Sequence, residues 1–151
     1  MSAEIKFPAI EVAPLTVTPR RSSEEVSVCA AKVLKTSFFK DYRLIDSTLR
    51  SFRASAVRMV RYKPPFWGWR WMWPRQAEIE IEFESPAQLS LEEVHDLVMQ
   101  MVRSEADIWE ESWPDLDELE ALVRSAKSIE EIADLLDPRP EGNNASSTKA
   151  P

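Results

Sequence analysis

Residues 77–84, Ala-Glu-Ile-Glu-Ile-Glu-Phe-Glu, alternate apolar residues with glutamates without interruption. Because successive side chains of a β-strand point to opposite faces, this pattern predicts a strand with one apolar and one acidic face. Beyond Pro86 the apolar residues recur at helical spacing, and Ser90 with Glu93 forms a capping box. The chain must therefore cover the apolar face of a sheet with amphipathic helices, the first of them at about 90–105.

Three further helices are predicted from similar signals, a capping residue, or for one helix Pro114, followed by apolar residues at helical spacing. They cover residues 23–36 and 115–126 and a short segment that begins after Ser128 and ends before Pro138. Cys29 falls on the apolar side of the first helix, which favours burial over reactivity.

Two other segments show the alternation of a strand. Residues 1–22 alternate apolar residues between Pro8, Pro14 and Pro19, which predicts an extended arm that either adds an edge strand or stays loose. From about Leu49 a second strand carries two sets of side chains on opposite faces. One set is Phe52, Ala54, Ala56, Val60 and Tyr62, and the other is Arg53, Ser55, Val57, Met59 and Arg61.

This order of elements predicts an α+β fold, a small antiparallel sheet of about three to four strands packed by an N-terminal helix and three C-terminal helices. We expect an extended arm at 1–22, a single domain at 23–137 and a disordered tail at 138–151, which is rich in polar residues. The sequence holds only two glycines, so the glycine-rich phosphate loops of nucleotide-binding folds are absent.

The scarcity of histidine and cysteine excludes much site chemistry. His95 and Cys29 are the sole residues of their types, so one chain cannot build a His/Cys metal site or an internal disulfide. We therefore predict no metal and no cofactor, and interpret His95, at the edge of an apolar helix face, as structural. The cytoplasm is the expected compartment, and no apolar run is long enough to span a membrane.

Charge is divided unevenly between the two halves of the chain. The net charge is −7, but residues 1–75 hold 14 Lys and Arg against 6 Asp and Glu, while residues 76–151 hold 5 against 20. The simplest interpretation is that the halves pair with each other, and the alternative is a partner of one sign. The acidic stretch between Arg103 and Arg124 also contains two tryptophans.

That stretch supplies the candidate binding residues, because carboxylates accelerate encounter with a basic protein and tryptophan supplies contact area. The competing interpretation is a solvated loop whose acidic residues favour the N-terminus of the next helix. The predicted binding set, here named the acidic tryptophan surface, is Glu105, Asp107, Trp109, Glu110, Glu111, Trp113 and Asp117.

A second tryptophan cluster, in residues 67–73, is the alternative binding site. Its indoles, spaced two apart, fill the core, form a protein interface, or stack on nucleic acid or carbohydrate beside neighbouring arginines. The alternative set is Trp67, Trp69, Arg70, Trp71 and Trp73, and the arginines and lysine that extend it are Arg50, Arg53, Arg58, Arg61, Lys63 and Arg75.

The glutamates at 78, 80, 82 and 84 have two interpretations. Catalytic carboxylates need a set separation across a substrate, which regular spacing on one strand face does not show. Pairing with arginines on a neighbouring strand is the simpler interpretation.

These residues predict a non-enzymatic acidic protein-binding module, for example an immunity-like or antitoxin-like inhibitor of a basic protein. The alternatives are a nucleic-acid-binding protein that uses the Arg/Trp-rich segment, and a secretion chaperone or adaptor. A homodimer is compatible with either class.

Overall fold

The computed structural model of the chain describes residues 4–14, 16–30, 34, 38–62 and 76–137. The alternative tryptophan cluster at 67–73 and the tail at 138–151 lie outside these ranges. In chain order the elements are β1 (Ala9–Ala13), β2 (Thr16–Arg20), α1 (Ser23–Val26), β3 (Val28–Ala30), β4 (Arg43–Ile45), β5 (Arg50–Tyr62), β6 (Gln76–Phe83), β7 (Ala87–Gln88), α2 (Leu91–Ser104), α3 (Ala106–Trp109), α4 (Leu116–Ser125) and α5 (Ile129–Leu136).

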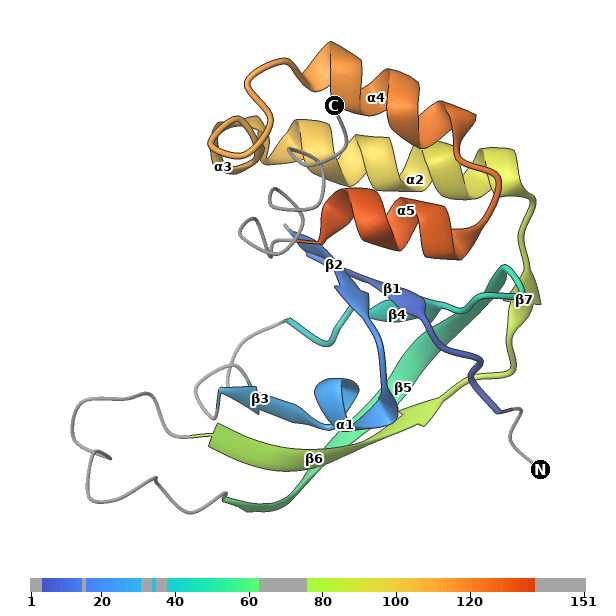
Figure 1. Ribbon diagram of the computed structural model, residues 1–151. Helices are drawn as coiled ribbons and strands as arrows, with labels where there is room; N and C mark the ends of the chain where they lie inside the picture. Colours follow the sequence, from blue (N-terminus) through green and yellow to red (C-terminus); the bar gives the residue numbers. More distant parts are fainter. Residues whose placement is uncertain (1–3, 15, 31–33, 35–37, 63–75, 138–151) are drawn as a thin grey trace.

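The prediction of a small sheet of three or four strands is wrong. The strands form one seven-stranded sheet in the order β2-β1-β4-β5-β6-β3, with β7 paired to the start of β5, and every pairing is antiparallel. Figure 1 shows the sheet as a strongly curled layer, with β1, β2 and β4 below the helices and β6 and β3 at its far end. The chain is mixed α and β, as expected.

The missing strands come mainly from the segment predicted to be an arm. β1 is buried along its whole length because it pairs with β2 on one side and β4 on the other. Pro8 precedes β1, and Pro14 lies between the two strands. Pro19 lies within β2, which is an edge strand of the sheet. The N–H that proline lacks is not needed there for a hydrogen bond to β1. All three prolines therefore occupy positions that are compatible with β1 and β2.

The side chains of β5 switch between the two faces of the sheet at two points along the strand. The alternation predicted from the sequence did not include these switches. Its register with β6 skips one residue at Ser55 and again at Val60, as in a β-bulge. Each bulge moves the following side chains to the other face and bends the strand. On the inner, concave face the register pairs Ala54 with Phe83, Val57 with Ile81, and Met59 with Ile79.

The three predicted C-terminal helices are present within one or two residues of their expected bounds. The capping box of Ser90 and Glu93 begins α2, and the side chains of Asp115 and Ser128 cap α4 and α5. These helices stack on one another and on the β1–β2 side of the sheet (Figure 1). The main core between them contains Ile10, Val12, Val17, Ile45, Val94, Val98, Val102, Leu119, Val123, Ile129, Ile132 and Leu136.

The N-terminal helix predicted over 23–36 is wrong in extent. Ser22 caps it as expected, accepting a hydrogen bond from the Glu25 amide at 3.4 Å, but α1 ends at Val26. The Ser27 carbonyl then accepts a hydrogen bond from the Ile79 amide at 2.7 Å, and Val28–Ala30 pair with β6. Pairing with a strand far along the chain has overridden a local helical signal.

A second core fills the concave side of the curled sheet. It contains Tyr42, Leu44 and Phe52 and is extended by partly buried aromatic side chains. Glu11, on the same face of β1 as Ala9 and Ala13, is 4% exposed and lies inside this core. The sheet therefore has an inner hydrophobic layer of its own, separate from the layer under the helices.

Candidate functional site

The acidic tryptophan surface occupies one end of the helical layer, around α3 and the segment that joins α3 to α4. Glu105 lies between α2 and α3, and Trp109 ends α3. Trp109 and Trp113 are half-buried and pack against the main core, and the Trp113 amide donates to the Trp109 carbonyl at 2.8 Å. Asp107, Glu110 and Glu111 are exposed. The two indoles therefore anchor a turn that presents carboxylates to solvent.

A cleft of about 260 Å³ lies beside the two indoles. One wall is the outer strand β2 and the other is Trp109, Trp113 and the end of α5. Ile108 lines the cleft and is 60% exposed, the largest exposure among the large hydrophobic side chains that the structure describes. The cleft and this side chain give the surface an apolar contact area next to its charges.

The carboxylates of this surface differ in whether they already have a partner. Asp117 pairs with Arg103 at 2.7 Å, so it belongs to the internal network of the helices. Among the described residues, no ion pair involves the other four, which are Glu105, Asp107, Glu110 and Glu111. The surface therefore keeps four carboxylates available to an external cation.

On the neighbouring helices α2 and α4, acidic side chains form ion pairs with arginines of the same chain. Glu120 accepts hydrogen bonds from Arg103 at 2.8 Å and from Arg124 at 2.9 Å, which hold its pKa below the ordinary value. Arg124 also binds Asp96 at 2.7 Å, which ties α4 to α2. The expectation that the basic and acidic halves pair with each other is also met, because Arg21 of the first half binds Asp134 at 2.8 Å and Asp137 at 3.2 Å.

The arginines of the alternative nucleic-acid surface are paired wherever the structure describes them. Arg50 binds Asp46 at 2.8 Å and Arg53 binds Asp41 at 3.2 Å. Arg58 pairs with Glu80, and Arg61 with Glu78 at 3.5 Å. Lys63, Arg70, Arg75 and the four tryptophans lie outside the described residues. The described part of this surface is thus largely neutralised by its own chain.

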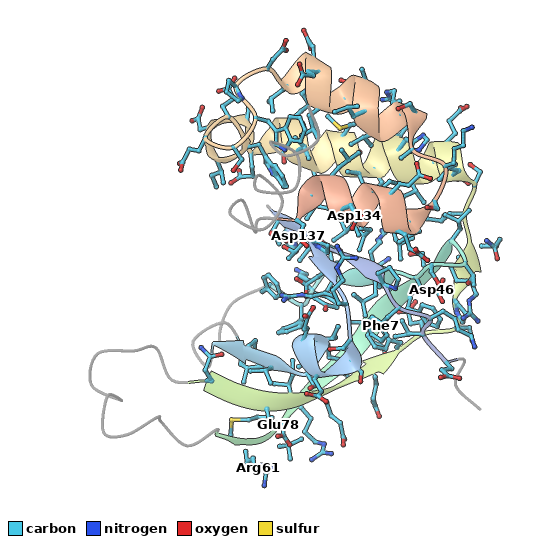
Figure 2. All side chains as sticks on the ribbon, viewed as in Figure 1. Phe7, Asp46, Arg61, Glu78, Asp134 and Asp137 are labelled. Carbon is cyan, nitrogen blue, oxygen red and sulfur yellow. The ribbon has the colours of Figure 1, made fainter. Side chains whose placement is uncertain are left out.

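Two of the four residues of the glutamate stripe, Glu78 and Glu80, form cross-strand pairs of the kind that the sequence predicted. Figure 2 shows Glu78 and Arg61 together on the outer side of the β5–β6 pair, whereas Phe7 lies on the other side of the sheet. Exposed pairs of this kind contribute little, about 0.2–1 kcal/mol each. Glu78 and Glu80 therefore act as partners for arginines on an outer face.

The histidine and the cysteine have structural surroundings. The His95 side chain is buried, and its Nε2 donates to the Ala126 carbonyl at 3.0 Å, which links α2 to the end of α4. Cys29 lies on β3, not on the predicted helix, and burial followed by the nearby Glu11 carboxylate raises the pKa of its thiol. Within the described ranges, no group of three or more His, Cys, Asp or Glu side chains is placed to hold a metal ion.

A larger hollow of about 1120 Å³ was missed by sequence reasoning. It lies on the concave side of the sheet, between the later part of β6, α1 and the residues before β1. Its apolar lining comes from Ile5, Phe7, Val26, Leu44, Phe52, Ile79, Ile81 and Phe83. These side chains come from distant segments, so no local pattern marks the hollow.

No family model, curated protein or solved structure matches the chain. No helix in the described ranges is both long enough and apolar enough to cross a bilayer.

Proposed function

We propose that this chain is a non-enzymatic binding protein, and that its acidic tryptophan surface docks onto a basic partner protein. One observation carries the proposal: residues 105–113 hold four carboxylates without an ion pair among the described residues, the exposed Ile108, and two tryptophans that line a cleft. Unpaired charge raises the rate of encounter, and aromatic and aliphatic contacts hold the complex after docking.

An inhibitor of the immunity or antitoxin type is the concrete form that we favour, acting in the cytoplasm by covering a basic face of its target. A secretion chaperone or adaptor would use the same surface in the same way. Nucleic-acid binding receives less support, because Arg50, Arg53, Arg58 and Arg61 are already paired with carboxylates of this chain.

The test is affinity capture of the tagged full-length protein from lysate of the cells that produce it, at low and moderate salt. The comparison variant carries Glu110→Lys and Glu111→Lys. The matched control carries Glu92→Lys and Glu130→Lys, which change the net charge equally at exposed positions of α2 and α5. The proposal requires a basic protein near 1:1 that the wild type and the control retain and the comparison variant loses. Retention by all three proteins contradicts it.

Charge reversal at Glu110 and Glu111 is expected to slow association with that partner by about tenfold at low salt, with a smaller change in dissociation. The reason is that exposed charges act mainly on the diffusional encounter. Surface plasmon resonance at two salt concentrations measures both rates, and the difference between variant and wild type should shrink as salt rises. Equal association rates for the variant and the Glu92/Glu130 control would exclude this surface.

Truncation of Trp113 to alanine is expected to speed dissociation by about 30-fold, because buried tryptophans contribute about 2 kcal/mol or more at interfaces. Trp113 also packs against the main core, so its variant is compared with Ile108→Ala, which removes only an exposed side chain. Both variants should dissociate faster while associating at the wild-type rate. An unchanged dissociation rate for Ile108→Ala would remove the cleft from the interface.

A further inference from the structure

Within the described part of the chain, the later half of β6 is an open sheet edge. β6 pairs with β5 along most of its length, but β3 covers only its first residues, through Glu78, Ala77 and Gln76. The Ile79 amide points to this side, where it donates to the Ser27 carbonyl at 2.7 Å. The Glu84 amide points to the opposite side and donates to the Arg53 carbonyl at 2.8 Å.

These two bonds fix which backbone groups face the open edge. Backbone N–H and C=O groups alternate between the two sides of a strand, so those of Ile81 and Phe83 point away from β5. Neither residue has a strand partner on that side in the described part of the chain. Two donors and two acceptors are therefore presented in line, with the spacing that an added strand needs.

The hollow of about 1120 Å³ lies directly against this edge. Its far side is formed by α1 and by Ile5 and Phe7, and its lining includes every residue from Ile79 to Pro86. The space beside the strand is therefore bounded by apolar side chains on the concave face of the sheet. Ligand-binding cavities commonly have volumes of about 300–1,000 Å³, so this hollow is large enough for several side chains.

The two faces of the edge differ in chemistry. Ile81 and Phe83 lie on the concave face and pack with the second core. Glu80, Glu82 and Glu84 alternate with them and belong to the other face, where Glu80 pairs with Arg58. Glu82 and Glu84 are exposed and have no ion pair with any described residue. The edge thus offers apolar contacts on one face and two available carboxylates on the other.

We propose that this edge binds an extended segment of a partner protein in which apolar and basic residues alternate, added antiparallel to β6. Its apolar residues lie opposite Ile81 and Phe83, exchange backbone hydrogen bonds with them and place their side chains in the hollow. Its basic residues then fall on the face of Glu82 and Glu84. This site is separate from the acidic tryptophan surface and does not depend on it.

The glutamate stripe also argues against a second copy of this chain as the occupant. An antiparallel pair of two β6 edges would place glutamates of one copy beside glutamates of the other on the outer face. Like charges directly opposite each other destabilise a strand pair. The acidic residues at this edge therefore oppose self-association and favour a basic segment.

The test is residue-resolved hydrogen exchange by NMR on the full-length protein. The probe is a capped peptide, Lys-Val-Lys-Ile-Lys-Val-Lys. In the free protein the Ile81 and Phe83 amides should exchange quickly, while the Glu82 amide, which faces β5, exchanges slowly. At saturating peptide, exchange at Ile81 and Phe83 should slow by about tenfold or more, with little change at Trp109 and Trp113.

Two methylated peptides test the geometry. A peptide methylated on the amide nitrogens of its apolar residues loses the donors that face β6, and its affinity should fall at least tenfold. A peptide methylated instead on the backbone amide nitrogens of its lysines keeps the donors that face β6. It should bind nearly as well as the unmethylated peptide. Equal binding of both methylated peptides would show that the contact is not strand addition.

Charge variants test the outer face. Glu82→Lys with Glu84→Lys should weaken peptide binding by about tenfold, whereas Glu92→Lys with Glu130→Lys and the Glu110/Glu111 reversal should leave it unchanged. Three results overturn the proposal: no protection at saturating peptide, protection of Ile81 and Phe83 without peptide, and protection that rises with protein concentration alone. The second result means that this chain covers its own edge, and the third means that a second copy does so.

Discussion

Replacement of Asp46 by alanine is expected to lower the free energy of unfolding by about 3–5 kcal/mol, because it leaves a partly buried guanidinium and several amides without an acceptor. Asp46 is fully buried. Its carboxylate accepts hydrogen bonds from the Thr48 hydroxyl at 2.7 Å and from the Thr48 and Arg50 amides at 3.0 Å. It also accepts from the Arg50 guanidinium at 2.8 Å and the Lys6 amide at 3.1 Å. Urea denaturation at pH 7 measures the loss.

The effect of Asp46 on stability should depend on pH in one direction. Burial alone would raise the pKa of Asp46, but hydrogen bonds from Thr48, Arg50 and Lys6 outweigh it and hold the pKa below its ordinary value. An unfolded aspartate has a pKa of about 3.9, so the stabilisation is complete above about pH 4 and is lost as the pH falls through the folded value. The difference in stability between wild type and Asp46→Asn should be constant from pH 5 to 7 and shrink below about pH 4.

A constant difference down to pH 2 would show that the charge of Asp46 contributes nothing to folding. The matched control is Asp41→Asn, since Asp41 is exposed and makes one surface pair with Arg53. That control should lower the free energy of unfolding by no more than about 1 kcal/mol at any pH.

Because Asp46 binds the residues just before β1, its replacement should also loosen Ile5 and Phe7, which line the hollow.

The C-terminal helices were predictable because their signals are local. Ser90, Asp115 and Ser128 each cap the backbone a few residues ahead, and the apolar spacing that follows determines the buried side. The acidic tryptophan surface was visible for the same reason, since its residues are close in sequence. The pairing of Asp117 with Arg103 was not visible, because two helices must first pack to bring these residues together.

The sheet was harder to predict because strand pairing is a long-range event. Val28–Ala30 follow a correctly predicted cap, yet they pair with residues near 77 instead of continuing the helix. The bulges at Ser55 and Val60 leave no mark in the alternation of β5, so the faces assigned from parity fail between the two bulges and hold again from Arg61. The open edge of β6 follows from the same facts, because β3 begins only at Val28, opposite Glu78, and the residues before it form α1.

Glu11 shows most clearly what the sequence concealed, because an acidic residue in an alternating segment predicts an exposed position. Instead it is buried on β1, a strand paired on both sides, where its Oε2 accepts from the Tyr42 hydroxyl at 2.6 Å and its Oε1 from Arg20 at 2.9 Å. Burial, followed by the nearby carboxylate, raises the pKa of Tyr42, so its phenol remains a donor. Replacement of Glu11 by alanine should cost about 3–5 kcal/mol, because both partners lose their acceptor inside the protein.

A triple variant separates two contributions to the free energy of unfolding. One is the penalty for leaving polar groups unpaired, and the other is the net stabilisation by the Glu11–Tyr42–Arg20 network. Glu11→Leu, Tyr42→Phe and Arg20→Met together remove every polar member and leave apolar side chains of similar volume, which often restores or exceeds wild-type stability. Urea denaturation should therefore rank the proteins as wild type, then the triple variant within about 2 kcal/mol, then Glu11→Ala. A triple variant as unstable as Glu11→Ala would show that the network itself stabilises the fold. The predicted ranking would instead mean that the network adds little net stability, and that Glu11→Ala is costly because it leaves the Tyr42 hydroxyl and Arg20 without their acceptor.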